Sequence, residues 1–169
     1  MALKLLFLLV FALLGPAAPV FAAEAVSEQS VRAALVFNFI KFTEWPAAVP
    51  GESQFRVCIA ASDREQFAAI EALKERRVRG KPLVTARFDR HVDCDVIYVD
   101  SRQHWNEIRE TRTSALTVGS YAGFAVNGGM IEISLLEGRP RFDINLLEAK
   151  RVGLRFYPQL LQLARRILD

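Results

Sequence analysis

Histidine, carboxylate and thiol groups gather in one short stretch of the chain, His91-Val92-Asp93-Cys94-Asp95. These residue types are the ones that bind transition metals in proteins. Metal sites usually draw their ligands from two clusters with defined spacing, and the sequence holds no second cluster of this kind. The stretch is therefore a weak candidate for a metal centre, and we expect no metal and no other cofactor.

Patterns that indicate catalysis are otherwise scarce. The sequence contains no P-loop, no metalloprotease helix and no serine nucleophile elbow. It has only two histidines, His91 and His104, and no paired carboxylates on one element, which leaves little for general acid–base catalysis. We therefore expect a protein that is not an enzyme and that works by binding.

Residues 1–22 have the pattern of a secretory signal peptide, with cleavage expected between residues 22 and 25. Lys4 precedes an apolar run at 5–14, and small residues follow up to Ala25. The run is too short to span a bilayer comfortably, although an uncleaved anchor is the alternative. We expect a single exported domain over residues 23–169, with no stable membrane insertion once the signal is removed.

Export changes the meaning of the two cysteines, Cys58 and Cys94. In an oxidising compartment an even number of cysteines favours a disulfide. Both cysteines belong to expected strands, at 55–61 and 94–99, and neighbouring strands bring Cα atoms within bridging range. Two buried free thiols are the alternative. A bridge across this loop would add about 3–4 kcal/mol to the stability in the chain-entropy model.

Four aromatic side chains lie close together in the stretch 37–46. Apolar residues at helical spacing predict a helix from Val31 to Trp45, which Pro46 would end. The aromatics widen the apolar surface, so the helix should be buried on more than one face, and core packing is their simplest role. Some residues near the helix end could instead reach a partner or a ligand. These candidates are Asn38, Lys41, Glu44 and Trp45.

A glycine-rich loop, Gly123 to Gly129, is the second candidate surface. Asn127-Gly128 is a strong turn dipeptide, so one interpretation is a turn that enters a hairpin. The other is a rim where backbone groups can approach a ligand or partner closely. No helix is expected directly after the loop, so dinucleotide binding is not supported. The candidate contacts here are Phe124, Asn127, Gly128 and Gly129.

Strand and helix patterns alternate along the chain. These elements must position the candidate residues. Helices are expected after the caps Ser27 or Ser30, Ser62-Asp63, Ser101 and Asn145. Strands are expected at 55–61, 83–88, 94–99 and 115–118. Residues 131–135 and 142–145 alternate around a turn at 137–140, which predicts an antiparallel hairpin at one sheet edge. A last helix starting at Pro158 is expected to bury Leu160, Leu161, Ala164, Ile167 and Leu168 and to expose Arg165 and Arg166.

The predicted fold is α/β, with a mostly parallel central sheet, helices on both faces and a C-terminal antiparallel hairpin. The chain has 169 residues and is 51% hydrophobic, enough for one domain with a full core. Its formal charge is +3, and removing Lys4 with the leader leaves 21 basic against 19 acidic residues, or +2. The basic residues are scattered, which argues against nucleic acid as a partner.

Eight segments carry a shared pattern in a fixed order. They are Phe37 to Pro46, Val57 to Ile59, Cys94 to Tyr98, Leu116 to Val118, Gly123 to Ala125, Gly128 to Ile131, Arg141 to Asn145 and Gln159 to Ala164. Together they resemble the YfiR-like family of periplasmic proteins over nearly all of the mature chain. Two features depart from the family: a second cysteine pair toward the C-terminus is missing, and Tyr157-Pro158 leads the last helix in place of serine.

The resemblance implies a periplasmic regulator. Such a protein would bind the periplasmic sensor domain of an inner-membrane diguanylate cyclase, repress it, and so lower cyclic di-GMP and biofilm formation. A sensor kinase is the alternative partner, and the family suggests a homodimer. The competing function is a periplasmic small-molecule-binding protein that feeds a sensor kinase or a transporter. A deep pocket lined by Asn38, Trp45 and Asn145 would favour that second function.

Overall fold

The computed structural model describes residues 26–46, 53–111, 114–136 and 138–169. The expected signal peptide, residues 1–22, and the expected cleavage sites lie outside these ranges. None of the helices in the described ranges combines the length and the apolar character that crossing a bilayer requires.

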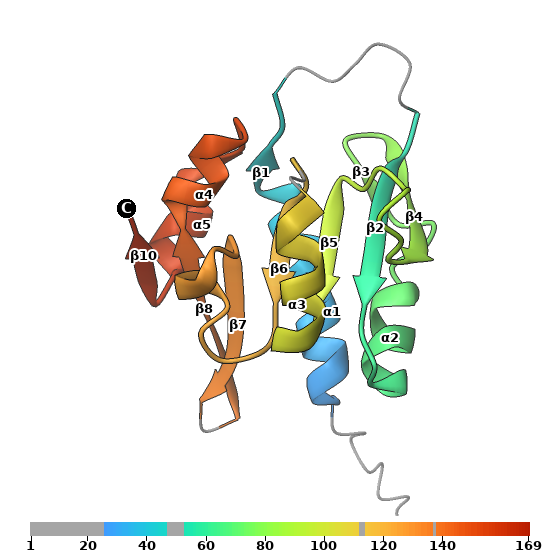
Figure 1. Cartoon of the computed structure of the whole chain (residues 1–169), viewed down its shortest axis with the longest axis horizontal. Coiled ribbons are helices and arrows are strands. Elements are labelled where there is room, and N and C mark those ends of the chain that lie inside the picture. Colours follow the sequence, from blue (N-terminus) through green and yellow to red (C-terminus); the bar gives the residue numbers. More distant parts are fainter. Residues whose placement is uncertain (1–25, 47–52, 112–113, 137) are drawn as a thin grey trace, which may run out of the picture.

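The described strands form one large sheet in the order β10-β8-β7-β6-β5-β2-β4-β3 (Figure 1). Its strands are β2 (Phe55–Ala60), β3 (Arg77–Val78), β4 (Lys81–Arg87), β5 (Val96–Val99), β6 (Leu116–Gly119), β7 (Ile131–Leu136), β8 (Arg139–Asn145) and β10 (Arg166–Leu168). Neighbours from β4 through β2, β5 and β6 to β7 are parallel, whereas β7 and β8 form an antiparallel hairpin. This is the strand order of a doubly wound sheet.

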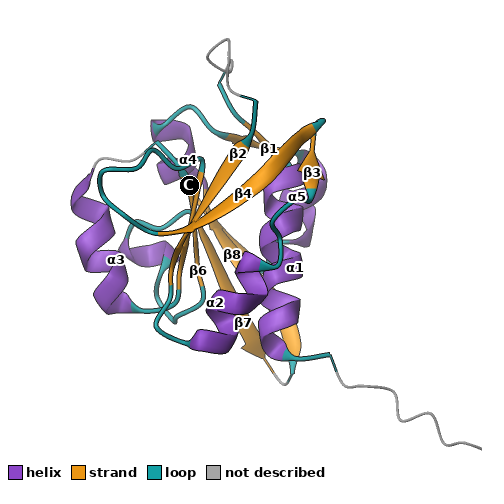
Figure 2. Cartoon of the chain, turned by 90° about the vertical axis from the view of Figure 1, so that its right-hand side faces the viewer, coloured by secondary structure: helices purple, strands orange, loops and turns teal. Residues whose placement is uncertain are grey.

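Helices cover both faces of the sheet (Figure 2). They are α1 (Glu28–Lys41), α2 (Arg64–Glu71), α3 (Arg102–Ile108), α4 (Leu146–Arg151) and α5 (Pro158–Leu163), with short 3-10 turns at Arg109–Thr111 and Ala125–Asn127. The larger core lies on the face that holds α1, α2 and α5, and a smaller core lies under α3. The predicted α/β architecture is therefore confirmed.

Capping side chains fix where most helices begin. Ser27, Asp63, Ser101 and Asn145 each accept a hydrogen bond from the backbone N–H three residues further on. Such a cap satisfies one of the donors that a helix start leaves free, and it depends only on local sequence. This is why these helix starts could be predicted.

The end of the first helix differs from the prediction. The helix stops at Lys41, and β1 (Thr43–Glu44) pairs antiparallel with β9 (Arg155–Phe156). Thr43 is fully buried, and its hydroxyl donates to the carbonyl of Phe39 at 2.7 Å. A strand partner more than a hundred residues away outweighs the helical spacing, so the predicted continuation to Trp45 was wrong. The buried side of α1 carries Ala33, Val36, Phe39 and Ile40, whereas Asn38 lies on the exposed side.

The end of the chain also differs from the prediction. Helix α5 stops at Leu163, and β10 adds to the sheet parallel to β8, so the hairpin does not lie at the sheet edge. Arg165 donates to the buried carboxylate of Asp143 at 2.7 and 2.6 Å, and Arg166 donates to it at 2.8 Å. The two arginines were expected only to face solvent. The buried acid accounts for the difference, because it holds this segment against β8.

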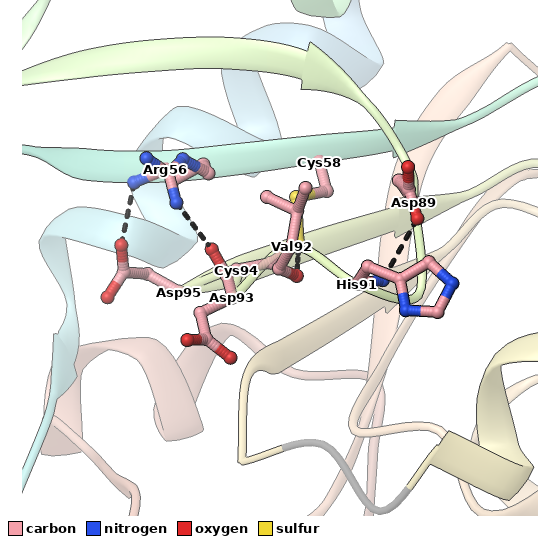
Figure 3. The surroundings of a disulfide bond; sticks show 8 residues. All are labelled: Arg56, Cys58, Asp89, His91, Val92, Asp93, Cys94 and Asp95. Carbon is pink, nitrogen blue, oxygen red and sulfur yellow. Dashed lines mark hydrogen bonds between the residues drawn. A yellow bond between two sulfur atoms is a disulfide. The ribbon is translucent and has the colours of Figure 1, made fainter.

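A loop tethered by a disulfide replaces the helix that usually connects parallel strands. Between β4 and β5, residues 88–95 cross the α3 face of the sheet, and Cys94 is bonded to Cys58 of β2 with their Cα atoms 5.9 Å apart (Figure 3). Arg56 donates to the carbonyl of Asp93 at 3.0 Å, and its N–H donates to Asp95 at 2.6 Å. The predicted disulfide is confirmed, although Cys94 precedes β5 instead of lying in it.

Candidate functional site

The candidate contact residues separate onto two faces of the molecule. Asn38 and Lys41 are exposed on the last turn of α1, and Glu44 and Trp45 follow in and after β1. Asn127 lies across the sheet, where its carbonyl accepts a hydrogen bond from the Trp105 indole of α3 at 2.9 Å. The structure therefore does not bring the two predicted surfaces together.

Phe124 was expected to be exposed, and this expectation was wrong. Its ring is fully buried under α3, 4.8 Å from the ring of Trp105. Gly119 and Gly129 lie so close to the ring that a Cβ atom added at either position would clash with the ring carbons. The glycines of this loop therefore make room for an aromatic side chain, and Gly129 is itself buried.

Replacing Gly129 by alanine should lower the free energy of unfolding by about 1–3 kcal/mol, since the methyl group would overpack the ring of Phe124. Urea unfolding of the variant measures this cost. Gly138→Ala is the matched control, because its Cβ would meet no atom within 4 Å and only its positive φ of 71° opposes alanine. Equal losses for the two variants would contradict the packing role assigned to Gly129.

Asn145 is also an internal residue. Its side-chain N–H donates to the carbonyl of Ala125 at 2.8 Å, and its oxygen accepts from the N–H of Glu148 at 3.1 Å. The side chain is 8% exposed. It thus joins the 3-10 turn after β6 to the start of α4.

The end of α1 forms the most distinctive surface, which we call the cationic–aromatic surface. It combines three cations with three half-buried rings. Its members are Phe37, Lys41, Phe42, Arg76, Arg79 and Tyr157. Lys41 Nζ lies 5.7 Å from the centre of the Phe37 ring, and Arg76 Cζ lies 5.0 Å from the same centre.

Tertiary contacts assemble this surface from three segments of the chain: the end of α1, the residues that flank β3, and Tyr157 before α5. Arg79, in the turn after β3, donates to the carbonyl of Thr43 at 2.7 Å and lies 5.9 Å from the Tyr157 ring. The rings of Phe42 and Tyr157 meet edge to face at 6.4 Å. Arg76, Arg79 and Tyr157 could not be predicted as members, since nothing in their local sequence places them beside α1.

The charges of this surface are not neutralised within the described part of the chain. Lys41, Arg76 and Arg79 are exposed, and none of them forms an ion pair with a described carboxylate. Aromatic side chains and arginine are enriched at protein–protein interfaces, and exposed cations are electrostatically complementary to an acidic partner. Trp45 follows β1 and packs on the Phe55 ring of β2, with ring centres 5.1 Å apart.

Neither of the two main hollows in the described part of the molecule has the lining predicted for a ligand pocket. The larger one, about 660 Å³, lies beside the disulfide between Arg56, Asp93 and the neighbouring loop. The smaller one, about 260 Å³, is bordered by Trp105 and Asn127. Asn38, Trp45 and Asn145 line neither hollow, so the arrangement that would favour a small-molecule receptor is not present there.

A Ser–His–Asp cluster lies at the carboxyl ends of β2 and β5. His104 Nδ1 is 2.7 Å from Asp100 Oδ1, and His104 Nε2 is 3.5 Å from Ser62 Oγ. An acyl-transfer site would also need free backbone donors for an oxyanion. The N–H groups of Ser62 and Asp63 instead donate to Asp100 Oδ2, at 2.6 and 3.3 Å. The cluster therefore holds the starts of α2 and α3 together, and its geometry supports no acyl transfer.

Asp100 is the acid of this cluster, and its environment keeps it ionised. Burial by itself raises the pKa of Asp100, but the hydrogen bonds from His104 and from two backbone N–H groups outweigh it and hold the pKa below its ordinary value. The side chain of His104 is only partly exposed, because its ring lies against Asp100. Within the described ranges, no three His, Cys, Asp or Glu side chains are placed to share a metal ion.

These features define a small, disulfide-bridged α/β domain of the doubly wound class. The chain belongs to the YfiR/HmsC-like family, whose profile matches residues 29–165. Membership supports a general role as a periplasmic regulator of cyclic di-GMP signalling, in a family of regulators rather than enzymes. The resemblance seen in the sequence motifs is therefore confirmed at the level of the family.

Two solved structures show a similar fold. A conserved domain protein from Vibrio cholerae O1 biovar eltor str. N16961 matches with a TM-score of 0.51 and 12% identity, over 84% of this chain and 60% of that one. The ABC domain in complex with L-Trp from Streptococcus pneumonia matches with a TM-score of 0.51 and 11% identity, over 78% of this chain and 60% of that one. The chain thus spans less than two thirds of either protein, and the likeness concerns the fold alone. No curated protein matches the chain in sequence.

Proposed function

We propose that this protein is a periplasmic regulator that binds the periplasmic sensor domain of an inner-membrane signalling protein. The partner is a diguanylate cyclase, which the bound protein represses, so that cyclic di-GMP and biofilm formation fall. The observation that carries the proposal is the family match over residues 29–165. Repression requires that the protein binds the inactive state of the cyclase more tightly than the active state.

The cationic–aromatic surface supports this proposal by offering a place for the partner. Its exposed cations would steer an acidic sensor domain toward the protein, and its rings would supply apolar contact area. Asn38, Glu44 and Trp45 lie close to its α1 members along the chain, and they would extend the contact region. Asn127 and Gly128 lie on the opposite face and would belong to a separate contact.

Binding to the purified periplasmic domain of a membrane diguanylate cyclase from the same organism tests the proposal. Titration calorimetry of the mature, oxidised protein should show a saturable complex, and cyclase output in cells should rise when the regulator is deleted. The same titration against a neighbouring sensor kinase domain tests the alternative partner. No complex with either domain, under oxidising and reducing conditions, would overturn the proposed function.

Reversing charge on the cationic–aromatic surface should weaken this complex by about tenfold, or about 1.4 kcal/mol, for Lys41→Glu and for Arg76→Glu. Both side chains are exposed, so the free energy of unfolding should change by less than about 0.5 kcal/mol. Arg139→Glu is the control, because this exposed residue at the start of β8 gives the same change in net charge and is not a member of the cationic–aromatic surface. If the control weakens binding equally, net charge and not this surface carries the effect.

A further inference from the structure

Strand β4 is only partly covered at the outer edge of the sheet. Strand β3 is the last strand in that direction, and it pairs with β4 only through Arg77 with Pro82 and Val78 with Lys81. Strand β4 then continues to Arg87. Figure 2 shows this part of β4 crossing the front of the molecule without another described strand outside it.

The direction of the backbone groups along this edge follows from the hydrogen bonds at its two ends. Leu83 faces outward, since its N–H donates to the carbonyl of Arg76 at 2.7 Å and its carbonyl accepts from Glu75 at 3.0 Å. Phe88 faces inward, since its N–H donates to Ile59 of β2 at 3.0 Å. Hydrogen-bonding direction alternates along a strand, so residues 85 and 87 also face outward. Each presents one N–H and one carbonyl to the open side.

The side chains do not close this edge. Arg87 lies over the Phe67 ring of α2 at 4.4 Å, and its guanidinium donates to the carbonyl of Ala61 at 3.4 Å. The arginine is therefore drawn across the α2 face, away from the backbone groups that it would otherwise shield. Thr85 is half-buried and Ala86 is exposed. Uncovered strand edges of this kind readily pair with another extended chain.

We propose that the open edge at residues 84–87 binds an extended acidic segment of a partner protein by β-strand addition. The unpaired backbone groups require an extended chain, because only a strand can meet two donors and two acceptors in alternating register. The charges favour acidic residues, since Arg77 of β3 and Arg87 of β4 are exposed on the two outermost strands at this side of the sheet. A second copy of the chain is a poorer occupant, because antiparallel pairing would bring these like charges together.

This inference is independent of the proposed function, since it concerns another surface and can be tested without the cyclase. The probe is a short synthetic peptide of alternating valine and glutamate. Amide hydrogen exchange of the mature, oxidised protein is followed residue by residue by NMR. In the free protein, the amides of Thr85 and Arg87 should exchange fast, while those of Val84 and Ala86 should be slow. At a peptide concentration about ten times its Kd, exchange at 85 and 87 should slow about tenfold.

Two control peptides separate backbone pairing from charge. The same peptide with lysine in place of glutamate should protect residues 85 and 87 less, and N-methylation of its amides along one edge should abolish protection. Thr85→Pro removes an outward N–H and should prevent protection at Arg87, whereas Thr85→Val keeps the backbone donor and should not. The inference is overturned if the glutamate peptide leaves exchange at 85 and 87 unchanged. It is also overturned if protection rises with protein concentration alone, which would identify a second copy as the occupant.

Discussion

Loss of the Cys58–Cys94 disulfide is expected to lower the free energy of unfolding by about 3–4 kcal/mol. The bridge joins residues 36 positions apart, and a loop of this size restricts the unfolded chain by about that amount in the chain-entropy model. The native state adds a second reason. Residues 88–95 replace a crossover helix, and the covalent bond to a fully buried Cys58 holds them on the α3 face.

The double variant Cys58→Ala/Cys94→Ala, compared with the oxidised protein by urea unfolding, measures this effect. At about 3 °C per kcal/mol for a chain of this size, its melting temperature should fall by roughly 10 °C. His91→Ala is the control, since His91 lies exposed in the same loop without a side-chain contact to the bridge (Figure 3). If the double variant lowers the free energy of unfolding by less than about 1 kcal/mol, residues 88–95 keep their position without the disulfide.

Replacement of Asp143 by asparagine is expected to lower the free energy of unfolding by about 2–4 kcal/mol at neutral pH. Its carboxylate is fully buried in β8 and accepts three short hydrogen bonds from Arg165 and Arg166. The variant removes the charge but keeps the shape, so the two guanidinium groups lose their anion while remaining partly in solvent. Strand β10 should loosen first, which faster amide exchange at Ile167 and Leu168 would show.

The same carboxylate predicts a dependence of stability on pH. The hydrogen bond from Arg165 is the largest cause that holds the pKa of Asp143 below its ordinary value; burial opposes it, and the charges of both arginines add to it. The pKa of Asp143 in the unfolded chain is about 3.9, and in the folded protein it is lower. The stability that the carboxylate contributes is therefore complete above about pH 3.9 and is lost as the pH falls through the folded-state pKa. The difference in the free energy of unfolding between wild type and Asp143→Asn should therefore be constant near neutral pH and should shrink as the solution is made acidic.

Glu148→Gln is the control for this series. Glu148 forms an ion pair with the exposed Arg151 at 2.7 Å, and pairs of this kind contribute little. Glu148→Gln should therefore lower the free energy of unfolding by less than about 1 kcal/mol. If Asp143→Asn costs no more than Glu148→Gln, the buried pair with Arg165 does not anchor the end of the chain.

Local sequence decided the features that depend on near neighbours. Alternating strand and helix patterns gave the α/β class, and capping residues such as Ser27 and Asp63 gave most helix starts, because a cap acts within one turn. The disulfide was predicted from the even cysteine count of a chain expected to be exported, and the family was predicted from the order of the motifs.

Tertiary structure decided the features that depend on contacts between distant segments. Thr43 and Glu44 leave the helix because β9 pairs with them, and β10 forms because Asp143 binds Arg165. Phe124 is buried because two glycines, ten positions apart, make room for its ring. The cationic–aromatic surface needs side chains from three segments, and the open edge of β4 exists only because β3 is short. The sequence by itself determined the class of fold, the crosslink and the family. Only the tertiary structure decided which surfaces remain free to bind, since exposure is set by what the rest of the chain covers.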